Sequence, residues 1–551
     1  MARDVSSRGS RRQWLQAAAA AARSGALTPP PAALARMGAA LWRHGATPAT
    51  LLALSAARYP DRTAVIDDDG AITFAELYEA TLSLAAELGA AATPVRSVGV
   101  LCRNHRGFLI GFLASGMIGS ETVSINTELT PAQLASLLER HAPDVLVYDS
   151  EYAEAIHASA FAGLLIVADL DPDPRSGHSL AAILTRRATP TRLARRPGRI
   201  TLLTSGTTGL AKGVPRSIRP MSIVRLAATG AARADLRAGD VALIGPPFFH
   251  GFGLLAVLGS IALGITTVTH CRFDVDTVLD DLIRHRVTVL FAVPVMLQRI
   301  VASSTVASVA PNAHLRTAAT GAAPITGVTV SGFQRLFGDI LVNGYGSTEA
   351  GVVSIATSDD LLRFPTTAGR AALGVSIRIV NERGSLAATG EPGRILVRGP
   401  LGYSGYTPDP RTPTPPKDVI DGYVDTGDVG YVDESGLLFL SGRSDDMIVS
   451  GGENVFPLEV EHALADHPTV ADVAVIGVDD PEFGQVLRAF VVPAEHAIVD
   501  HDALTTYLRG VVERYKVPKR FVALTAIPRN PSGKVLRHKL IDHTSSKDVS
   551  R

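Results

Sequence analysis

One stretch of the sequence, LLTSGTTGLAKGVPRS from Leu202 to Ser217, combines residue types that can hold phosphate. Its glycines let backbone N–H groups approach an anion, its hydroxyl side chains donate hydrogen bonds, and its lysine adds positive charge. The residues concerned are Thr204, Ser205, Gly206, Thr207, Thr208, Gly209 and Lys212. A Walker A loop would need Gly-Lys-Ser/Thr, whereas Ala211 precedes Lys212 and Gly213 follows it. We therefore expect a phosphate-binding loop of a different kind, with a polar surface turn as the alternative.

Three further stretches place charged residues among glycines. They are GYGSTEAG from Gly344, YVDTGDVGYVDESGLLFLSGRSDDMIVSGGENVFPLEVE from Tyr423, and PRNPSGKVLR from Pro528. Each has a structural interpretation when it stands alone. Glu349 would suit a helix N-terminus, and Lys534 would suit a solvated surface. The four stretches together, in this order along the chain, favour a common function over four separate accidents.

The ordered series resembles the signature motifs of the adenylate-forming superfamily, which includes acyl-CoA synthetases, nonribosomal adenylation domains and luciferases. The resemblance extends from about Pro48 to Leu540. It implies a two-step reaction with ATP, Mg²⁺ and CoA. A carboxylate first attacks the α-phosphate of ATP, which gives an acyl-adenylate and pyrophosphate. A thiol, usually that of CoA, then displaces AMP. Such a site has to neutralise two anions and hold the attacking oxygen in line.

The resemblance also implies roles for residues of the large N-terminal part. Residues Thr204 to Lys212 would grip the β- and γ-phosphates. Tyr345 would stack near the adenine, Thr348 would bond to the α-phosphate, and Glu349 would hold Mg²⁺ through a hard oxygen ligand. The short match ATGAAP would place Gly321 and Ala322 against the adenine.

Further roles follow near the C-terminal end of the resemblance. Asp428 would accept hydrogen bonds from both ribose hydroxyls, and Arg443 would lie on the ribose side. Asp445 falls at the position of the family's hinge. Lys534 would bridge the carboxylate and the α-phosphate. In SGGENVFP, Gly451 and Gly452 would leave room for the pantetheine arm of CoA, with an ordinary tight turn as the alternative.

His250, in PPFFHGFG, resembles the family's residue beside the acyl carboxylate; a structural histidine is the alternative. No acid in FFHGFGLL could pair with a substrate ammonium, which favours an uncharged acid. We expect a fatty acid first, with aromatic and branched acids open. The alternatives to an acyl-CoA synthetase are a fatty acyl-AMP ligase that serves a carrier protein and an inactive acyl or nucleotide binder.

The composition narrows the class of protein. Lys plus Arg and Asp plus Glu number 53 each, so no overall charge attracts nucleic acid. Cys102 and Cys271 are too few for a disulfide framework or a cysteine-rich zinc site, and they suit a reducing cytoplasm. The charge-free segment between Asp240 and Arg272 is broken by prolines and glycines, so we expect no transmembrane span. Peripheral membrane contact stays open.

The elements that must position these residues follow an α/β pattern. Short apolar runs such as Ser97 to Cys102 and Asp339 to Gly346 alternate with helical patterns, one of which opens with a capping box at Thr73 and Glu76. We predict a large N-terminal domain of mostly parallel sheets packed with helices, a β-rich subdomain, and a small mobile C-terminal α/β domain. A helix is expected from His501 to Arg514.

The predicted boundaries are an N-terminal extension over 1–47, helical in one interpretation, an AMP-binding domain over 48–442, and a small domain over 443–551. The extension contains Arg11 and Arg12 before an alanine-rich run, as a twin-arginine export signal would. Because that run stops at Arg23, we favour a solvated helix over an export signal.

Overall fold

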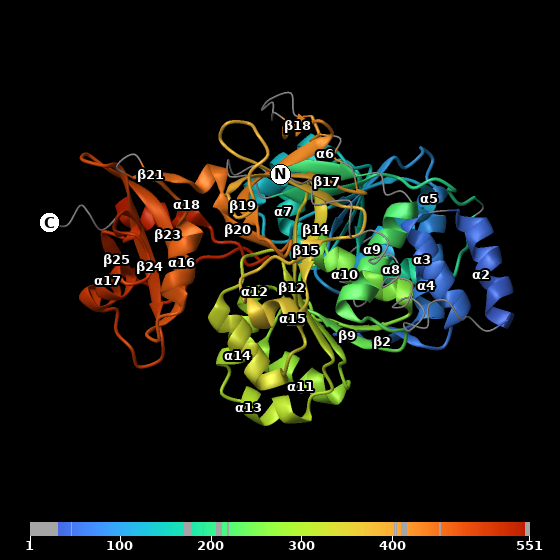
Figure 1. Ribbon diagram of the computed structural model, residues 1–551. Coiled ribbons are helices and arrows are strands. Elements are labelled where there is room, and N and C mark those ends of the chain that lie inside the picture. Colours follow the sequence, from blue (N-terminus) through green and yellow to red (C-terminus); the bar gives the residue numbers. More distant parts are fainter. Residues whose placement is uncertain are drawn as a thin grey trace.

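The fold is described from a computed structural model (Figure 1). The structure describes residues 31–45, 47–169, 178–190, 192–204, 212–216, 220–401, 403, 405–408, 416–450 and 453–545. Within these ranges no helix combines the length and the apolar character needed to cross a membrane. The two arginines of the possible export signal lie outside the described residues.

Two mostly parallel sheets form the large part of the chain. The six-stranded sheet has the order β6-β5-β3-β4-β7-β8, and only β8 runs antiparallel to its neighbour. Its strands are β3 (Ser97–Leu101), β4 (Glu121–Ser124), β5 (Val145–Tyr148), β6 (Leu164–Val167), β7 (Ile200–Thr204) and β8 (Lys212–Arg216). The predicted strands near Ser97, Asp144 and Leu164 are confirmed. Buried β-branched and leucine side chains on these strands explain the parallel arrangement.

The nine-stranded sheet has the order β15-β14-β13-β12-β11-β9-β10-β1-β2, with antiparallel pairs only at its two edges. Its strands are β1 (Thr63–Asp67), β2 (Gly70–Thr73), β9 (Val241–Ile244), β10 (Thr266–Val268), β11 (Val289–Phe291), β12 (Thr317–Gly321), β13 (Leu341–Ser347), β14 (Gly351–Ala356) and β15 (Arg370–Ala371). The carboxyl ends of β12 and β13 meet at one edge of the sheet, where parallel strands commonly carry binding loops.

Helices cover these two sheets. They are α2 (Pro31–His44), α3 (Pro48–Arg58), α4 (Phe74–Gly89), α5 (Arg106–Ile118), α6 (Pro131–His141), α7 (Ala153–Ala158), α8 (Leu180–Thr185), α9 (Pro220–Ala234), α10 (Gly251–Leu263), α11 (Val275–Arg284), α12 (Pro294–Ala302), α13 (Val306–Val309), α14 (Gly327–Phe337) and α15 (Ser358–Arg363). The predicted capping box of α4 is confirmed: Glu76 N donates to Thr73 Oγ1 at 3.2 Å, and Thr73 N donates to Glu76 Oε2 at 2.8 Å. The apolar segment after His250 is a helix of 13 residues, too short to span a membrane.

Two further sheets follow along the chain. The first is antiparallel and has five strands: β16 (Ser376–Val380), β17 (Gly393–Arg398), β18 (Val419–Ile420), β19 (Tyr423–Val432) and β20 (Leu438–Arg443). It confirms the predicted β-rich subdomain. The second has β21 (Ile448–Ser450), β22 (Glu453–Val455), β23 (Val470–Asp480), β24 (Gly484–Pro493) and β25 (Arg520–Ala523). It packs with α16 (Pro457–Ala465), α17 (His501–Arg509) and α18 (Arg537–Ser545) around a core of its own.

The helix predicted from His501 to Arg514 is wrong at its C-terminal end, because α17 stops at Arg509 and Gly510 is its C-terminal cap. Glycine weakens a helix, and the next turn at Arg514–Lys516 is a separate 3₁₀ helix. The other elements establish an α/β fold with a large N-terminal part and a small C-terminal α/β unit.

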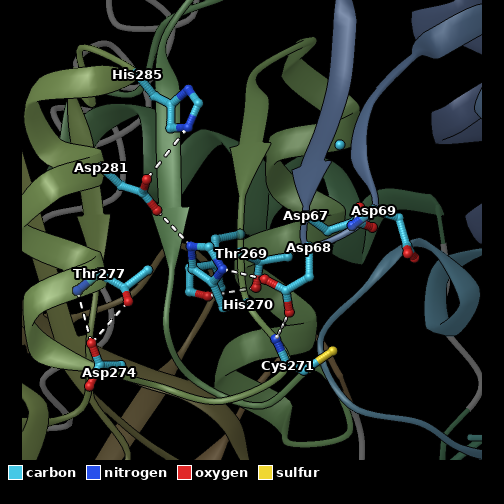
Figure 2. Close-up of polar contacts among 12 residues, drawn as sticks. Asp67, Asp68, Asp69, Thr269, His270, Cys271, Asp274, Thr277, Asp281 and His285 are labelled. Carbon is cyan, nitrogen blue, oxygen red and sulfur yellow. Dashed lines mark hydrogen bonds and ion pairs between the residues drawn. The ribbon is translucent and has the colours of Figure 1, made fainter.

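A charged cluster joins the outer edge of the nine-stranded sheet to α11. His270 lies between two carboxylates, with Nδ1 2.5 Å from Asp68 Oδ1 and Nε2 2.6 Å from Asp281 Oδ2 (Figure 2). His285 Nε2 lies 3.5 Å from the other oxygen of Asp281. We call Asp68, His270, Asp281 and His285 the His270 cluster. These two hydrogen bonds, led by the one to Asp281, raise the pKa of His270 to about 9.

Candidate active site

The carboxyl ends of β12 and β13 approach each other so closely that a side chain cannot fit between them. A Cβ atom added to Gly321 would lie 2.5 Å from the carbonyl oxygen of Gly344. The next residue, Ala322, has a φ of 69°, which is uncommon for a residue with a side chain. This backbone brings Gly321 and Ala322 beside the strand that carries Tyr345, so these three predicted adenine contacts share one edge.

Tyr345, Asp428 and Arg443 form a connected polar group at this edge. The Tyr345 hydroxyl donates to Asp428 Oδ2 at 2.5 Å, and Arg443 Nη1 donates to Asp428 Oδ1 at 3.3 Å. Asp428 and Arg443 are opposite each other in the antiparallel pair β19 and β20, which explains their contact. Arg443 also donates to both oxygens of Asp445, at 2.8 and 3.1 Å. The predicted hinge residue therefore holds the predicted ribose-side arginine.

Burial shapes the ionisation of this group. Burial raises the pKa of Asp428, while the hydrogen bond from Tyr345 and the positive charges of Arg443 and Lys534 act in the opposite direction. Each oxygen of Asp428 receives one bond from the protein, and a carboxylate oxygen has two lone pairs. Asp428 thus retains acceptor capacity for two ligand hydroxyls, which is the chemistry of a ribose.

Lys534 reaches this group from the C-terminal part of the chain. Its turn is closed by Asn530, whose N–H donates to the Lys534 carbonyl at 2.9 Å and whose Oδ1 accepts from Lys534 N at 2.9 Å. The turn packs on the large N-terminal part of the chain. A Cβ atom built on Gly533 would lie 3.4 Å from Val295 Cγ1 and 3.6 Å from Val293 Cγ2. The docking thus fixes the position of Lys534.

Several charged residues influence the pKa of Lys534. Although Lys534 as a whole residue is exposed, the protein around its ammonium desolvates this group and lowers its pKa, and the nearby Arg443 adds to this effect. Asp428 and Glu349 act in the opposite direction. Lys534 therefore lies within electrostatic range of three residues that the sequence placed in one site, although they come from distant parts of the chain.

Glu349 is held by a residue that the sequence analysis missed. It lies in the turn between β13 and β14, and its Oε1 accepts a hydrogen bond from the Tyr406 hydroxyl at 2.8 Å. Burial and the adjacent carboxylate raise the pKa of Tyr406, so this phenol remains a donor. Lys212 Nζ also lies 5.5 Å from the centroid of the Tyr406 ring. The repeated Gly-Tyr in GYSGYT was the available signal for Tyr406.

The segment that carries Tyr406 also joins the strand after the predicted phosphate loop. Thr407 N donates to the Gly213 carbonyl at 2.8 Å, next to Lys212 on β8. At the other end of β8, buried Arg216 donates to the carbonyls of Thr348 and Leu401. Burial lowers the pKa of Arg216 to about 10, while Glu349 acts against this effect. Arg216 was not predicted, although it belongs to the stretch that first indicated phosphate binding.

His250 precedes α10 and makes no capping hydrogen bond to it. Burial, followed by the positive charge of Lys534, lowers the pKa of His250 to about 4, so the ring is neutral at pH 7. Asn104 fixes the preceding loop, since its Nδ2 donates to the Pro246 carbonyl at 2.9 Å and its Oδ1 accepts from Phe248 N at 2.7 Å. His250 therefore belongs to the same electrostatic environment as Lys534.

Two groups of predicted residues cannot be placed. Ser205, Gly206, Thr207, Thr208 and Gly209 lie outside the described residues, and the same holds for Gly451 and Gly452. Thr204 ends β7, and its backbone pairs with Lys212. Beyond the second gap, Asn454 Nδ2 donates to Glu382 Oε1 at 3.2 Å. The hairpin strand β22 thus contacts the β-rich subdomain through this residue.

A second cluster has side chains suited to a metal, but its hydrogen bonds give it a structural role. Cys102, His105 and Asp149 are buried and mutually close. His105 Nδ1 accepts from Gly107 N at 3.1 Å, and Nε2 lies 2.8 Å from Asp149 Oδ1. Burial raises the pKa of the Cys102 thiol well above its usual value. A protonated thiol and an imidazole engaged at both nitrogens are poor ligands. His105 instead caps α5, and Asp149 contacts the other nitrogen of its ring.

Comparisons with known proteins show the family to which the chain belongs. Residues 52–407 match the model of the AMP-binding enzyme family, and residues 459–534 match that of the AMP-binding enzyme C-terminal domain. The second match ends at Lys534.

Individual relatives cover almost the whole chain. A CoA ligase for a methyl-dioxo-octahydroindenyl propanoyl group from Rhodococcus jostii (strain RHA1) is 33% identical over 90% of this chain and 98% of its own. A feruloyl-CoA synthase from an Amycolatopsis species is 33% identical over 87% of this chain and 95% of its own. The o-succinylbenzoate CoA synthetase of Bacillus subtilis, solved with its acyl-adenylate, matches with a TM-score of 0.75 and 28% identity over 89% of this chain and 97% of that one. The same enzyme has been solved with ATP and magnesium.

Proposed function

The chain belongs to the AMP-binding enzyme family, and we propose that it is an AMP-forming acid–CoA ligase that converts a carboxylic acid into its acyl-adenylate and then into its CoA thioester. The observation that supports this proposal most strongly is that the turn containing Lys534 packs on the large N-terminal part of the chain. This packing brings Lys534 within electrostatic range of Asp428 and Glu349. An inactive binder would have no need of a lysine within electrostatic range of these two carboxylates.

In the proposed ATP site, the adenosine lies along the edge formed by β12 and β13. Gly321 and Ala322 leave a flat backbone surface for the adenine, and Tyr345 lies beside it. Asp428 accepts from the ribose hydroxyls while Tyr345 and Arg443 hold its carboxylate in place. Thr348 follows on the same turn, which brings the α-phosphate toward Glu349.

The phosphates require positive charge, and several groups supply it. Lys212 and residues 204–209 are proposed to hold the β- and γ-phosphates, while Arg216 anchors the backbone of Thr348. When bound at Glu349, Mg²⁺ would neutralise phosphate charge. The Tyr406 hydroxyl donates to one oxygen of Glu349, and the other oxygen would be available to hold the metal.

Lys534 and His250 are proposed to act on the reacting carboxylate. In adenylation, an oxygen of the substrate carboxylate forms a bond to the α-phosphorus of ATP. At the same time the bond between the α-phosphorus and the oxygen that bridges it to the β-phosphate breaks, and pyrophosphate leaves. Lys534 stabilises the negative charge that the two reactants share. His250 is neutral at pH 7, so it can orient the carboxylate by a hydrogen bond without binding it as a competing cation.

For the second step we propose that the sulfur of CoA bonds to the acyl carbon, the bond to AMP breaks, and the thiol proton is released to solvent. The unit over 443–551 would rotate at Asp445 so that Gly451 and Gly452 replace Lys534 beside the adenylate. The observed contacts suit the first step, because Lys534 faces the site while Asn454 next to the hairpin contacts Glu382. A carrier-protein acceptor remains the second candidate, and its test is acyl transfer without CoA.

The substrate class is proposed from the relatives. Those described above are named for ring-bearing acids, including ferulate and o-succinylbenzoate. The fatty acid that the sequence favoured finds no support among them. We therefore propose a ring-bearing carboxylic acid as the first substrate class. The apolar helix α10, which follows His250, keeps a straight-chain acid as the second.

A substrate panel tests the proposal. Purified protein is given ATP, Mg²⁺ and CoA with ferulate, indoleacetate, palmitate or an α-amino acid, and AMP formation is measured with and without CoA. We expect CoA-dependent AMP formation that is fastest with a ring-bearing acid. Faster turnover with palmitate would restore the fatty-acid assignment, faster turnover with an amino acid would contradict the acyl-pocket interpretation, and no AMP with any acid would favour an inactive binder.

A further inference from the structure

One face of α2 presents large apolar side chains to solvent. Leu34, Leu41 and Trp42 are 54%, 52% and 75% exposed. The inward face of α2 is buried at Ala33 and His44 and packs on α3. Trp42 lies opposite this face, and Leu34 and Leu41 lie to one side of it. Three large apolar side chains are thus exposed on one short helix whose contact with the core is made by other residues.

The spacing of these residues gives a continuous stripe. Positions 34, 41 and 42 fall on one side of a helix, and Gly38 between them has no atom within 4 Å of its Cβ direction. The helix lies at the edge of the molecule, at the opposite end from the C-terminal sheet (Figure 1). The stripe is thus accessible to a large flat partner, with the C-terminal unit well away from it.

Positive charge lies along one side of the stripe. At about 3.6 residues per turn, Arg36 and Arg43 fall on the far side of Trp42 from Leu34 and Leu41, and Arg36 Nε donates to the Ala57 carbonyl at 2.8 Å. The Arg195 guanidinium stacks 5.0 Å from the centroid of the Trp42 ring, and Arg195 Nη2 donates to the Trp42 carbonyl at 3.2 Å. Arg196 beside it is also exposed. The chain has equal numbers of basic and acidic residues, yet neither residues 5–60 nor residues 174–234 contain an Asp or Glu. The two segments that meet at Trp42 are therefore basic in a protein that is neutral overall.

We propose that this face of α2, with Arg43 and Arg195, binds the surface of an anionic lipid bilayer. A tryptophan and leucines bordered by arginines match the side chains that enter a bilayer interface, where the rings and leucines leave water while the arginines meet lipid phosphates. The surface contact proposed here is independent of the catalytic proposal.

Other occupants fit the charges less well. A second copy docked face to face would bring two basic faces together. The chain's own residues 1–30 carry five arginines and one aspartate, so their net charge is also positive. A nucleic acid would satisfy the arginines but would leave Leu34 and Leu41 without an apolar partner.

Fluorescence tests the proposal, because the full chain contains only Trp14 and Trp42. In a Trp14→Phe variant, Trp42 is the sole tryptophan. Adding vesicles of equal parts phosphatidylcholine and phosphatidylglycerol at low salt should shift its emission to shorter wavelength. Pure phosphatidylcholine vesicles should give little shift, and high salt should reverse the binding.

Co-sedimentation with the same vesicles assigns the binding to side chains. Arg43→Gln should weaken it about five-fold, as expected for one basic residue near an anionic surface. Replacing Leu34 and Leu41 by Gln together should weaken it at least as much. Two exposed residues of the C-terminal unit serve as matched controls: Arg514→Gln and Ile498→Ser should bind normally. CoA-ligase activity without vesicles should be unchanged in all these variants.

Four outcomes would overturn the proposal. The first is equal binding to neutral vesicles, and the second is normal binding by the α2 variants. The third is loss of vesicle binding when Trp14→Phe is the only substitution, and the fourth is a change of oligomeric state without vesicle binding. The third would assign the contact to the preceding segment, and the fourth would assign the face to a second copy. Melting curves of each variant separate a lost surface contact from misfolding.

Discussion

The His270 cluster and the candidate active site each contain a partly buried histidine near charged groups, and the pKa values of the two histidines are shifted in opposite directions. Hydrogen bonds to Asp281 and Asp68 raise the pKa of His270 to about 9. Burial and the positive charge of Lys534 lower the pKa of His250 to about 4. One ring therefore remains charged at pH 7 and the other remains neutral.

The difference lies in where the balancing charges come from. In the His270 cluster, both ring nitrogens already contact carboxylates of the protein. In the active site, burial and then the charge of Arg443 lower the pKa of Lys534, and burial and then the charge of Lys534 lower the pKa of His250. Asp428 and Glu349 offset this only in part, since the pKa of Lys534 is still lowered. In the His270 cluster the protein's own carboxylates balance the positive charge, whereas in the active site an anionic ligand would balance it. Changes in the first region should mainly affect stability, and changes in the second mainly activity.

Glu349→Gln should have the largest effect, because it removes the proposed metal-binding charge while keeping the shape of the side chain. We expect acyl-adenylate formation to fall roughly 10²–10³-fold, the usual cost of losing one charge-stabilising group. The measurement is pyrophosphate release over a range of Mg²⁺ concentrations. Near-normal release at limiting Mg²⁺, with an unchanged melting temperature, would show that Glu349 is not the metal ligand.

Asp428→Asn should act mainly on ATP binding. The amide keeps one acceptor oxygen but loses the charge that faces Arg443 and Lys534, so we expect the KM for ATP to rise about ten-fold or more. Asp433→Asn, in a turn of the same β-rich subdomain, is the control. An unchanged KM for ATP in the Asp428 variant would argue against the ribose contact.

Tyr406→Phe should have a smaller and more specific effect. Loss of one hydrogen bond to Glu349 should raise the Mg²⁺ concentration needed for half-maximal adenylation by about five-fold. Saturating Mg²⁺ should restore the rate, which a general structural defect would not allow. The control is Tyr431→Phe on β19. If excess Mg²⁺ fails to rescue the Tyr406 variant, its role is structural.

The smallest effect on activity is expected in the His270 cluster, where pH should change stability. The pKa of His270 lies above its unfolded value of 6.5, at about 9. Its contribution is thus fully present below about pH 6.5 and is lost as the pH rises through about 9. The melting temperature of the large part should fall over this range, and His270→Gln should flatten the fall while leaving turnover per folded molecule unchanged. A wild-type protein equally stable at pH 6.5 and 9.5 would contradict the assignment.

The sequence predicted the elements whose signals are local. The capping box at Thr73 and Glu76, the buried strand near Ser97 and the β-rich subdomain all follow from patterns within a few residues. The end of α17 was missed because a single glycine outweighed a continuing helical pattern. The predicted boundaries of the domains stay predictions.

The residues that depend on distant contacts were harder to find. Ordered motifs indicated Asp428, Glu349 and Lys534, but nothing in the sequence joined Tyr406 to Glu349 across 57 positions or Arg216 to Thr348 across 132. The same holds for His270 and Asp68, which are 202 positions apart. Such pairs are set by how the sheets and loops pack, so no short pattern could predict them.

The central claim is that Lys534 serves adenylation from a docked C-terminal unit, and separating the two half-reactions of Lys534→Ala tests it most directly. Pyrophosphate release from ATP and the free acid should fall roughly 10²–10³-fold. Thioester formation from ready-made acyl-adenylate and CoA should continue at close to the normal rate. Lys539→Ala, on the exposed surface of α18, should change neither step. Loss of both half-reactions in the Lys534 variant, with circular dichroism showing an intact fold, would contradict the account, and so would normal adenylation.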